Sequence, residues 1–500
     1  MKLKDNTSVG LDGISSKILK MSAPVIVPYL TYIINRSLFE NKFPNHWKGS
    51  EIIPIHKSGN TTSPNNFRPI PILPTVSKLL ERFVQRQFMA FLEENNLLSP
   101  AQFGFRKKHS TVTSLVKVTD EWMKAIDEGK YTGAVFIDLK KAFDCVNHDI
   151  LLCKLREIGV SEDCLPWFED YLKGRFISTS LNSNLSTPLP ISFGVPQGSI
   201  LGPLLFIVFI NDLFRCAANC SIQLYADDTV VYFSDDNIDN IQTKLSNDLH
   251  SIYEWMCLNK LTINFDKTVS LLIGSRHMLS RHDKLNICIN GTPIQQVDHV
   301  KYLGFIVDNK LKWDIHVENL CKKAGKLVNY LARLRYFINE SNLNVIYKAI
   351  ILPLFDYADI ILDSSANKYI KQLQTLQNRA GRIIMKTNPY DHVSNFQIHS
   401  VLNWSSLESR RKKHLNLFVF KSVHDMLSSS MNDMFQPSSF SYSLRSSGNF
   451  ILPKPRTEYC KRTTHYRGSV QYNALPLAMK LEQSPNIFMK DLANVIPAFL

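Results

Sequence analysis

The chain lacks any paired arrangement of cysteines. Its nine cysteines are scattered, and the closest two, Cys216 and Cys220, are followed by no second Cys/His pair at zinc-ligand spacing. A structural zinc site usually takes four such ligands, and a small secreted protein pairs its cysteines in a framework, so the spacing disfavours both classes. We therefore expect core or surface thiols in a protein of a reducing compartment.

Long hydrophobic runs are also missing. The longest, Ile200–Ile210, contains Gly202 and Pro203 and is too short to cross a bilayer, which takes about 20 residues. It is predicted to be a buried helix. The polar start Met1–Asp5 leads into no apolar stretch, so no signal peptide is expected. We expect no membrane partner and a location in the nucleus, the cytoplasm or both.

Acidic residues are outnumbered by basic ones. The 58 Lys and Arg face 44 Asp and Glu, which gives a net charge of +14. This excess suits a polyanionic partner, most commonly nucleic acid, although charge alone leaves open a basic protein without one. The 500 residues exceed what one hydrophobic core supports, so about two to four subdomains are expected.

The most informative segment is Tyr225–Asp228, a Tyr-Ala-Asp-Asp sequence between two apolar runs at 221–224 and 229–233. This pattern predicts a β-hairpin with Asp227 and Asp228 at its tip. Adjacent carboxylates repel each other and raise one pKa unless cations join them. A pair of divalent metal ions, about 3.5–4 Å apart, resolves the conflict and catalyses in-line phosphoryl transfer.

A two-metal site needs a third carboxylate, and Asp138 is the candidate. It ends the apolar segment Tyr131–Leu139, which predicts a buried central strand where an unpaired charge would be costly. The alternative is a helix N-cap. Asp144 is expected to cap or pair locally. Phe143 could exclude a ribose 2′-hydroxyl beside the metals, although taken alone it is a core residue.

A loop bounded by Gly and Pro, Gly194–Ser199, lies between the two carboxylate elements. Backbone can approach a ligand closely there, and Gln197 offers an amide. In chain order, the segment around Asp138, the Gly194–Ser199 loop and Tyr225–Asp228 resemble motifs A, B and C of reverse transcriptases. The flanks resemble non-LTR, LINE-type retrotransposon polymerases, with jockey-like tails. These flanks are Gly10–Ile14, Asn66–Ile70, Gln102–Arg106, Leu258–Lys267, Tyr302–Gly304 with Trp313, Leu376–Ala380, Tyr466–Gly468 and Asn473–Pro476.

The resemblance implies a role for each matching residue. Asp138, Asp227, Asp228 and the Leu139 carbonyl would hold two Mg²⁺ ions, with Mn²⁺ as a possible substitute. Phe143 would select deoxynucleotides. The other implied contacts are Gln197 and Gly198 beside the incoming nucleotide, Arg68 and Arg106 on its triphosphate, Lys267 on the leaving pyrophosphate, and Tyr302, Leu303 and Gly304 as the primer grip. From its residue type alone, Lys267 could equally be an exposed strand lysine.

The implied fold is α+β: a right-hand polymerase with fingers, a ferredoxin-like α/β palm and a helical thumb. Apolar spacing predicts helices over 110–129 and 238–259 and a strand over 301–307. The basic run Arg410–Lys413 is a nuclear import patch or, more plainly, a solvated helix face. The expected divisions are 1–130, N-terminal extension and fingers; 131–310, palm with finger insertions; 311–400, thumb; and 401–500, helical tail with a Ser-rich linker at 427–449.

The resemblance predicts an RNA-directed DNA polymerase with an RNA template, a DNA primer or target, and deoxynucleotides as partners. Relatives of this type carry an endonuclease ahead of the polymerase, and none fits before Gly10. We therefore expect a truncated copy or a partial gene model. The alternatives are an idle retrotransposon relic that only binds nucleic acid, and an RNA-dependent RNA polymerase, against which Phe143 speaks.

Overall fold

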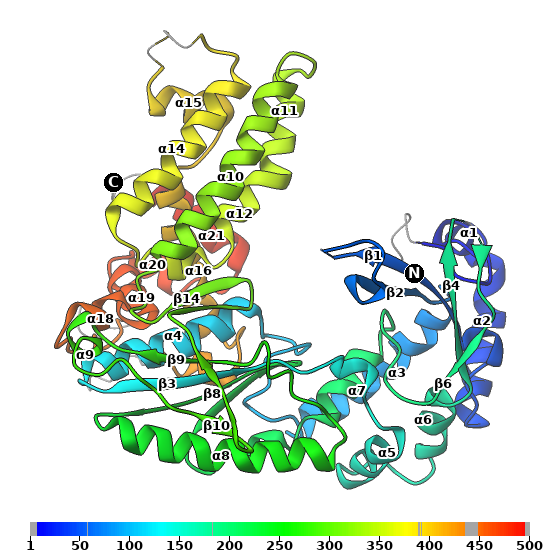
Figure 1. Ribbon diagram of the computed structural model, residues 1–500. Helices are drawn as coiled ribbons and strands as arrows, with labels where there is room; N and C mark the ends of the chain where they lie inside the picture. Colours follow the sequence, from blue (N-terminus) through cyan, green and yellow to red (C-terminus); the bar gives the residue numbers. More distant parts are fainter. Residues whose placement is uncertain are drawn as a thin grey trace.

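Two arms rise from a central base and give the molecule the outline of a U (Figure 1). One arm comes from the N-terminal half of the chain, and the other consists of helices from the second half. The base between them contains a β-sheet. The computed structural model describes residues 8–57, 59–182, 184–388, 391, 393–435 and 449–495.

The sheet of the base has five strands in the order β12-β9-β3-β8-β7. Its central strand, β3, is buried at all seven positions, which explains its nearly continuous apolar sequence. The predicted buried strand is thereby confirmed, and it ends just before Asp138. The strands are β3 Tyr131–Ile137, β7 Ser221–Tyr225, β8 Asp228–Asp235, β9 Val269–Ile273 and β12 Gln295–Gln296.

Helices α4 (Thr111–Asp127) and α8 (Ile238–Leu258) cover the two faces of this sheet (Figure 1). Ala134 packs in the apolar cluster that contains α4, and Val135 in the cluster that contains α8, as strand alternation requires. A Cβ at Gly133 would lie 2.5 Å from an α8 side chain, so glycine lets that helix approach the strand. Both predicted helices are confirmed.

The N-terminal arm is built on a second sheet, in which β1 pairs antiparallel with β2 and parallel with β4. The β4 pairing brings Gly49 beside Phe176, so the middle of the chain completes the arm. The strands are β1 Gly49–His56, β2 Phe67–Ile72, β4 Arg175–Leu181, β5 Asn184–Leu185 and β6 Leu189–Ile191. The helices are α1 Ser16–Met21, α2 Ala23–Phe39, α3 Ser77–Glu94, α5 His148–Glu157, α6 Leu165–Leu172 and α7 Gly202–Phe209, and α7 is the predicted buried helix.

The second arm is helical. Its long helices α10 and α14 pack side by side (Figure 1). Its elements are α10 Asp314–Leu334, α11 Glu340–Ile346, a π-helical turn Tyr347–Ile351, α12 Leu352–Asp356, α13 Asp359–Leu362, α14 Asn367–Ile384 and α15 Asn395–Leu402. The C-terminal helices are α16 Leu407–Val423, α17 Ser429–Asn432, α18 Glu458–Arg462, α19 Thr464–Asn473, α20 Leu477–Lys480 and α21 Pro485–Val495. No helix among the described residues is long and apolar enough to cross a membrane.

The C-terminal helices return to the base. The carboxylate of Asp120 on α4 accepts the backbone N–H groups of Thr464 and His465, each at 2.8 Å, and so caps α19. About two helical turns further along α4, the carboxylate of Asp127 accepts the backbone N–H of Thr457 at 2.6 Å. The chain end is therefore fixed to α4 of the base. In the predicted linker 427–449, residues 429–432 form α17, and residues 436–448 lie outside the described part of the chain.

The basic run Arg410–Lys413 lies in α16. Its first two arginines point into an ion-pair network: Arg410 makes two hydrogen bonds with Asp356, at 2.8 and 2.6 Å, and Arg411 donates to Asp363 at 2.9 Å. The Arg411 side chain is only 4% exposed. The prediction of a solvated helix face is therefore wrong for these two residues.

The strand predicted over 301–307 is instead a hairpin. β13 (His299–Tyr302) and β14 (Phe305–Asp308) pair antiparallel, and Leu303 and Gly304 form the turn with φ of 46° and 80°. Leucine seldom adopts a positive φ, so its sequence gave no turn signal. The remaining short elements are α9 Arg276–Leu279, β10 Cys288–Ile289 and β11 Thr292–Pro293.

Candidate active site

The three predicted carboxylates meet at one end of the central strands. β3 pairs with β8 so that Ile137 lies opposite Thr229, and the next pair in this register is Asp138 with Asp228. Asp227 precedes Asp228 in the β7–β8 turn. Their carboxylates interact electrostatically, as their pKa shifts record. Two residues far apart in sequence thus face each other because the strands are neighbours.

The β7–β8 turn is supported from behind by Gln102. Its buried Oε1 accepts the N–H of Gly104 at 2.7 Å and that of Ala226 at 3.0 Å. Ala226 has a positive φ of 55°, which turns the chain so that the two aspartates follow one another at the tip. A Cβ at Gly104 would lie 2.4 Å from the Ala226 nitrogen. Only glycine therefore lets the two segments approach this closely.

Asp138 is held by a partner that the sequence did not indicate. The amide of Asn264 donates to its Oδ2 at 2.7 Å, and the backbone N–H of Asn264 donates to its carbonyl at 2.8 Å. Lys267 lies nearby, with its Nζ 3.9 Å from Asp138 Oδ2. Asn264 and Lys267 both belong to the segment predicted from motif D. That segment therefore orients the first carboxylate.

The carboxylates are poor in compensating charge. Burial, followed by the charges of Asp227 and Asp138, raises the pKa of Asp228 to about 6. Burial, followed by Asp138, also raises the pKa of Asp227. In the described part of the chain, the contact between Lys267 and Asp138 is the single ion pair that the three carboxylates make. Such a surplus of negative charge is stable only with cations or protons.

The donor chemistry fits divalent metals. The predicted ligands are oxygens alone, three carboxylates and the Leu139 carbonyl, and hard divalent cations prefer oxygen. Leu139 bridges Ile263 on the neighbouring segment, which fixes its backbone beside Asp138. Among the described residues, a tighter cluster of possible ligands, with all its ligand atoms within 4.8 Å, occurs elsewhere, at Asp356, Asp359 and His414. The three site carboxylates are more widely spaced than that cluster.

Phe143, five positions after Asp138, is held in place by two aromatic neighbours. Its ring stacks on Phe206 of α7, with centroids 4.2 Å apart, and Phe105 meets it edge-on at 6.3 Å. Its backbone carbonyl accepts the N–H of Val195 at 2.9 Å. The segment after Asp138 and the Gly194–Ser199 loop are thereby joined.

Gln197 and Gly198 lie on this loop. The Gln197 amide donates to Asp144 Oδ1 at 2.6 Å, so Asp144 pairs across 53 positions rather than locally as expected. Gly198 has a φ of 75°, and a Cβ there would lie 2.9 Å from the Pro71 carbonyl on β2. The loop is therefore pressed between the N-terminal arm and the base.

The basic residues predicted for the triphosphate differ in their freedom. Arg68 is exposed on β2, opposite Ile55 of β1. Arg106 is turned onto its own loop, where Nη1 donates to the Ser99 carbonyl at 2.7 Å, and burial lowers its pKa. Lys267 is 70% exposed. Arg68 and Lys267 are thus free to reach a ligand, whereas Arg106 already uses part of its guanidinium for the backbone.

The predicted primer grip divides into a core residue and a turn. Tyr302 is buried against Phe136, with ring centroids 5.4 Å apart, and burial raises the pKa of its hydroxyl. Leu303 and Gly304 form the hairpin turn, and the hydroxyl of Tyr357, from the helical arm, donates to the Leu303 carbonyl. Leu303 is buried like Tyr302, so Gly304 is the exposed residue of the three, and the turn is tied to the second arm.

A base sheet with three carboxylates, placed between two arms, is the arrangement of a right-hand nucleic-acid polymerase. The model of the family "Reverse transcriptase (RNA-dependent DNA polymerase)" matches residues 55–307, which is half of the chain. The chain therefore belongs to the reverse transcriptase family, and the predicted α+β right-hand fold is confirmed. Reverse transcriptases use divalent metal ions, in agreement with the oxygen-only site.

The relatives are polymerases of non-LTR transposons, as the sequence motifs predict. The chain is similar to the probable RNA-directed DNA polymerase from transposon BS of Drosophila melanogaster, at 29% identity over 82% of this chain and 46% of the relative. It is also similar to the RNA-directed DNA polymerase from the mobile element jockey of Drosophila melanogaster, at 28% identity over 77% of this chain and 42% of the relative. The chain thus spans about half the length of the curated relatives it matches.

A similarity to a solved structure is weaker. Telomerase from Candida albicans, in complex with a fragment of telomeric RNA, aligns with a TM-score of 0.36 and 14% identity, over 78% of this chain and 68% of the other.

Proposed function

We propose that this chain is an RNA-directed DNA polymerase, which adds deoxynucleotides to a primer 3′-hydroxyl on an RNA template. The observation that carries the proposal is the set of three carboxylates on adjacent strands, whose charge is left almost uncompensated at the point where the two arms meet the base. Phe143, five positions after Asp138 and held by its stack on Phe206, would exclude a ribose 2′-hydroxyl and so select deoxynucleotides.

Asp138, Asp227, Asp228 and the Leu139 carbonyl would hold two Mg²⁺ ions, for which Mn²⁺ could substitute. When bound, such ions activate the primer hydroxyl and offset the charge of the triphosphate and of the leaving pyrophosphate. Asn264 holds the Asp138 carboxylate in one orientation. Gln102 fixes the turn that presents the other two.

The remaining side chains would bind and orient the substrates. Gln197 and Gly198 would border the incoming nucleotide, and Arg68 would meet its phosphates. Arg106 could do so only with the donors that its loop leaves free. Lys267 would neutralise the leaving pyrophosphate. The Leu303–Gly304 turn would position the primer end, while Tyr302 anchors that turn in the core.

The subdomains that we propose follow the predicted divisions, with one change. Fingers would comprise 1–110 and the segment around β4–β6, the palm 111–310, the thumb 311–400 and the tail 401–500. α4 is placed with the palm because it packs on β3, β7 and β8. The net charge of +14 supports an RNA template and a DNA primer as partners.

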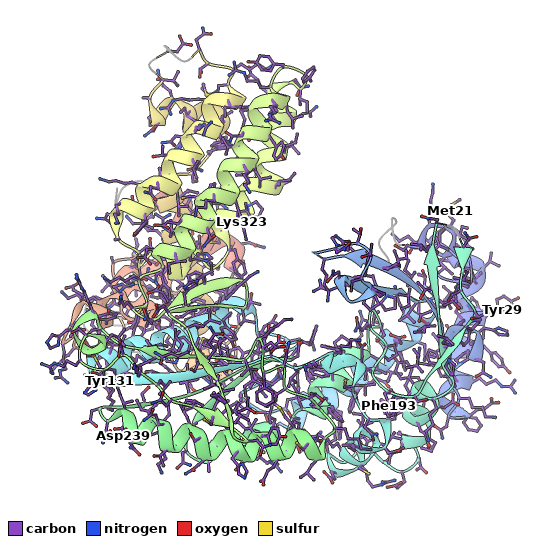
Figure 2. All side chains as sticks on the ribbon, viewed as in Figure 1. Met21, Tyr29, Tyr131, Phe193, Asp239 and Lys323 are labelled. Carbon is purple, nitrogen blue, oxygen red and sulfur yellow. The ribbon has the colours of Figure 1, made fainter. Side chains whose placement is uncertain are left out.

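Primer extension tests the proposal. A DNA primer on an RNA template, with Mg²⁺ and deoxynucleotides, should be lengthened by the parent chain, and Asp227→Ala should abolish the product. Asp239→Ala is the matched control, because this exposed aspartate lies in the first turn of α8, at the outer edge of the base (Figure 2). Salt-sensitive RNA binding without extension would favour an idle relic, and a preference for ribonucleotides would favour an RNA polymerase.

A further inference from the structure

One face of α10 and the turn after it carries a continuous row of exposed basic and aromatic side chains, here called the α10 stripe. Five basic residues and no acidic residue occur between 321 and 339. The exposed members recur every three or four positions, which places them on one side of a helix. The opposite side is the buried one. The stripe consists of Lys322, Lys323, Lys326, Asn329, Tyr330, Arg333, Tyr336 and Phe337.

The chemistry of the stripe changes along its length. Its first part has only lysines as charged groups, whereas its last part is aromatic: Tyr330, Tyr336 and Phe337 are 59%, 73% and 87% exposed. Arginines lie over two of these rings, with Arg333 5.8 Å from the Tyr330 centroid and Arg335 4.9 Å from the Tyr336 centroid. Two adjacent aromatic rings this exposed at the end of a basic helix call for a partner.

The stripe starts at the primer hairpin. Lys323 lines a cavity of about 200 Å³ together with Gly304 of the hairpin turn, His316 and Tyr357. Figure 2 labels Lys323 on the upright arm above the base. Phe337 follows 14 positions later, so at about 1.5 Å per residue the aromatic end lies about 20 Å from this point. The stripe therefore leads from the proposed primer end toward the tip of the thumb.

Lysines and aromatic rings select different parts of a nucleic acid. Lysines neutralise phosphates, which duplexes and single strands both present. Aromatic rings stack on base faces, which a duplex conceals and a single strand exposes. An acidic protein would suit the lysines, but only unpaired bases suit a row in which cationic and aromatic groups alternate.

We propose that the aromatic end of the α10 stripe, Tyr330, Arg333, Tyr336 and Phe337, binds a single-stranded nucleic acid by base stacking. The bound segment is the unpaired strand that continues beyond the hybrid at the palm. The inference rests on the proposed function for the place of that hybrid, and the aromatic end itself is a binding surface that requires no catalysis.

Binding of a labelled 12-nucleotide single strand to the full chain tests this, measured by fluorescence anisotropy with RNA and with DNA in separate arms. The double variant Tyr336→Ala/Phe337→Ala should weaken the affinity about tenfold or more, given what one aromatic–base stack contributes. Phe396→Ala is the matched control, because this phenylalanine is 82% exposed on α15 of the same arm but lies off the stripe. It should bind like the parent.

An abasic strand of equal length separates stacking from charge. The parent should bind the abasic strand as weakly as the double variant binds the normal strand. The variant Lys322→Ala/Lys326→Ala should have a lower affinity for both strands. Equal affinity of parent and double variant for the normal strand would overturn the proposal. It would also be overturned if the double variant lost binding to anionic lipid vesicles but kept its binding to the strand. Extension of a primer–template whose only unpaired bases are the few template bases to be copied should be unchanged in the double variant, so a failure of the parent there would count against the polymerase and not against this surface.

Discussion

Two acidic groups of this protein differ in what surrounds them. Asp138, Asp227 and Asp228 sit in the palm with Lys267, at 3.9 Å, as their one ion-pair partner among the described residues. In the helical arm, proposed above as the thumb, Asp356 and Asp359 lie close to His414 of α16 and form the tighter metal-like cluster. By geometry alone, the thumb group is the better candidate for a metal site.

The partners of Asp356 and Asp359 argue against a metal site in the thumb group. Arg410 occupies both oxygens of Asp356, and His414 Nδ1 lies 2.6 Å from Asp359 Oδ2. Asp363, which follows on the same segment, is bonded by Arg411 and by Arg467 of the C-terminal tail, at 2.9 and 2.8 Å. Burial raises the pKa of carboxylates in both groups, so a raised pKa does not distinguish them. The unpaired charge favours Asp138, Asp227 and Asp228 as the proposed active site, and the paired charge makes the other group a structural joint.

The largest expected difference is between removing one carboxylate from each group. Asp227→Asn should lower primer extension by about 10³-fold or more, as losses of phosphoryl-transfer electrostatics do. It should leave the melting temperature equal or higher, because it relieves repulsion. Asp356→Asn should instead lower the melting temperature and leave primer extension by the folded protein little changed. Calorimetry and extension on both variants check the contrast, and a destabilised Asp227→Asn protein would contradict it.

Next comes the joint itself. Arg467→Ala should reduce the free energy of unfolding by up to about 3 kcal/mol, because Asp363 is left partly unpaired in a half-buried position. Denaturant titration measures this. Arg379→Ala is the control, since that arginine bonds Asn329 at an exposed site and should change stability little. Equal losses in the two variants would show that the tail does not hold the thumb.

The third prediction concerns pH. The pKa of Asp228 is raised to about 6, so extension at limiting Mg²⁺ should fall as the pH drops through about 6, where protons displace the metal. Because the folded pKa is the higher one, protonation favours the folded state, and the metal-free protein should gain stability from this group over the same fall in pH. Asp228→Asn should abolish that gain. A stability curve unchanged by this substitution would contradict the assignment.

The smallest effect is expected at Lys267. Its contact with Asp138 is long and exposed, so Lys267→Ala should change the free energy of unfolding by less than about 1 kcal/mol. Extension, in contrast, should fall several-fold if the ammonium neutralises pyrophosphate, and Lys267→Arg should restore part of it. Steady-state extension rates decide this. Lys267 lies in the turn before β9 and not in a strand as the alternative interpretation had it, so unchanged rates in the alanine variant would leave it as a plain exposed turn lysine.

Much of the site could be predicted from the sequence because it is locally encoded. The apolar run of β3, the Asp227–Asp228 pair and the glycines of the 194–199 loop each carry their own signal. The supporting roles of Gln102 and Asn264 could not be predicted, because nothing in the sequence distinguishes them from other amides. Their partners, Ala226 and Asp138, lie 124 and 126 positions away in the chain and are brought close only by the fold. The Leu303 turn was missed because its positive φ is imposed by the surrounding contacts.

The sequence by itself predicted the chemistry that we propose, since carboxylates of this kind, order and spacing match a site for divalent metals. Only the tertiary structure decided which charges stay free. Arg410 and Arg411 look like a surface patch in the sequence, yet they neutralise Asp356 and Asp363 in the thumb. No comparable arginine reaches Asp227 or Asp228 among the described residues. Charge compensation depends on distance in space, which neighbouring residues in the chain do not specify.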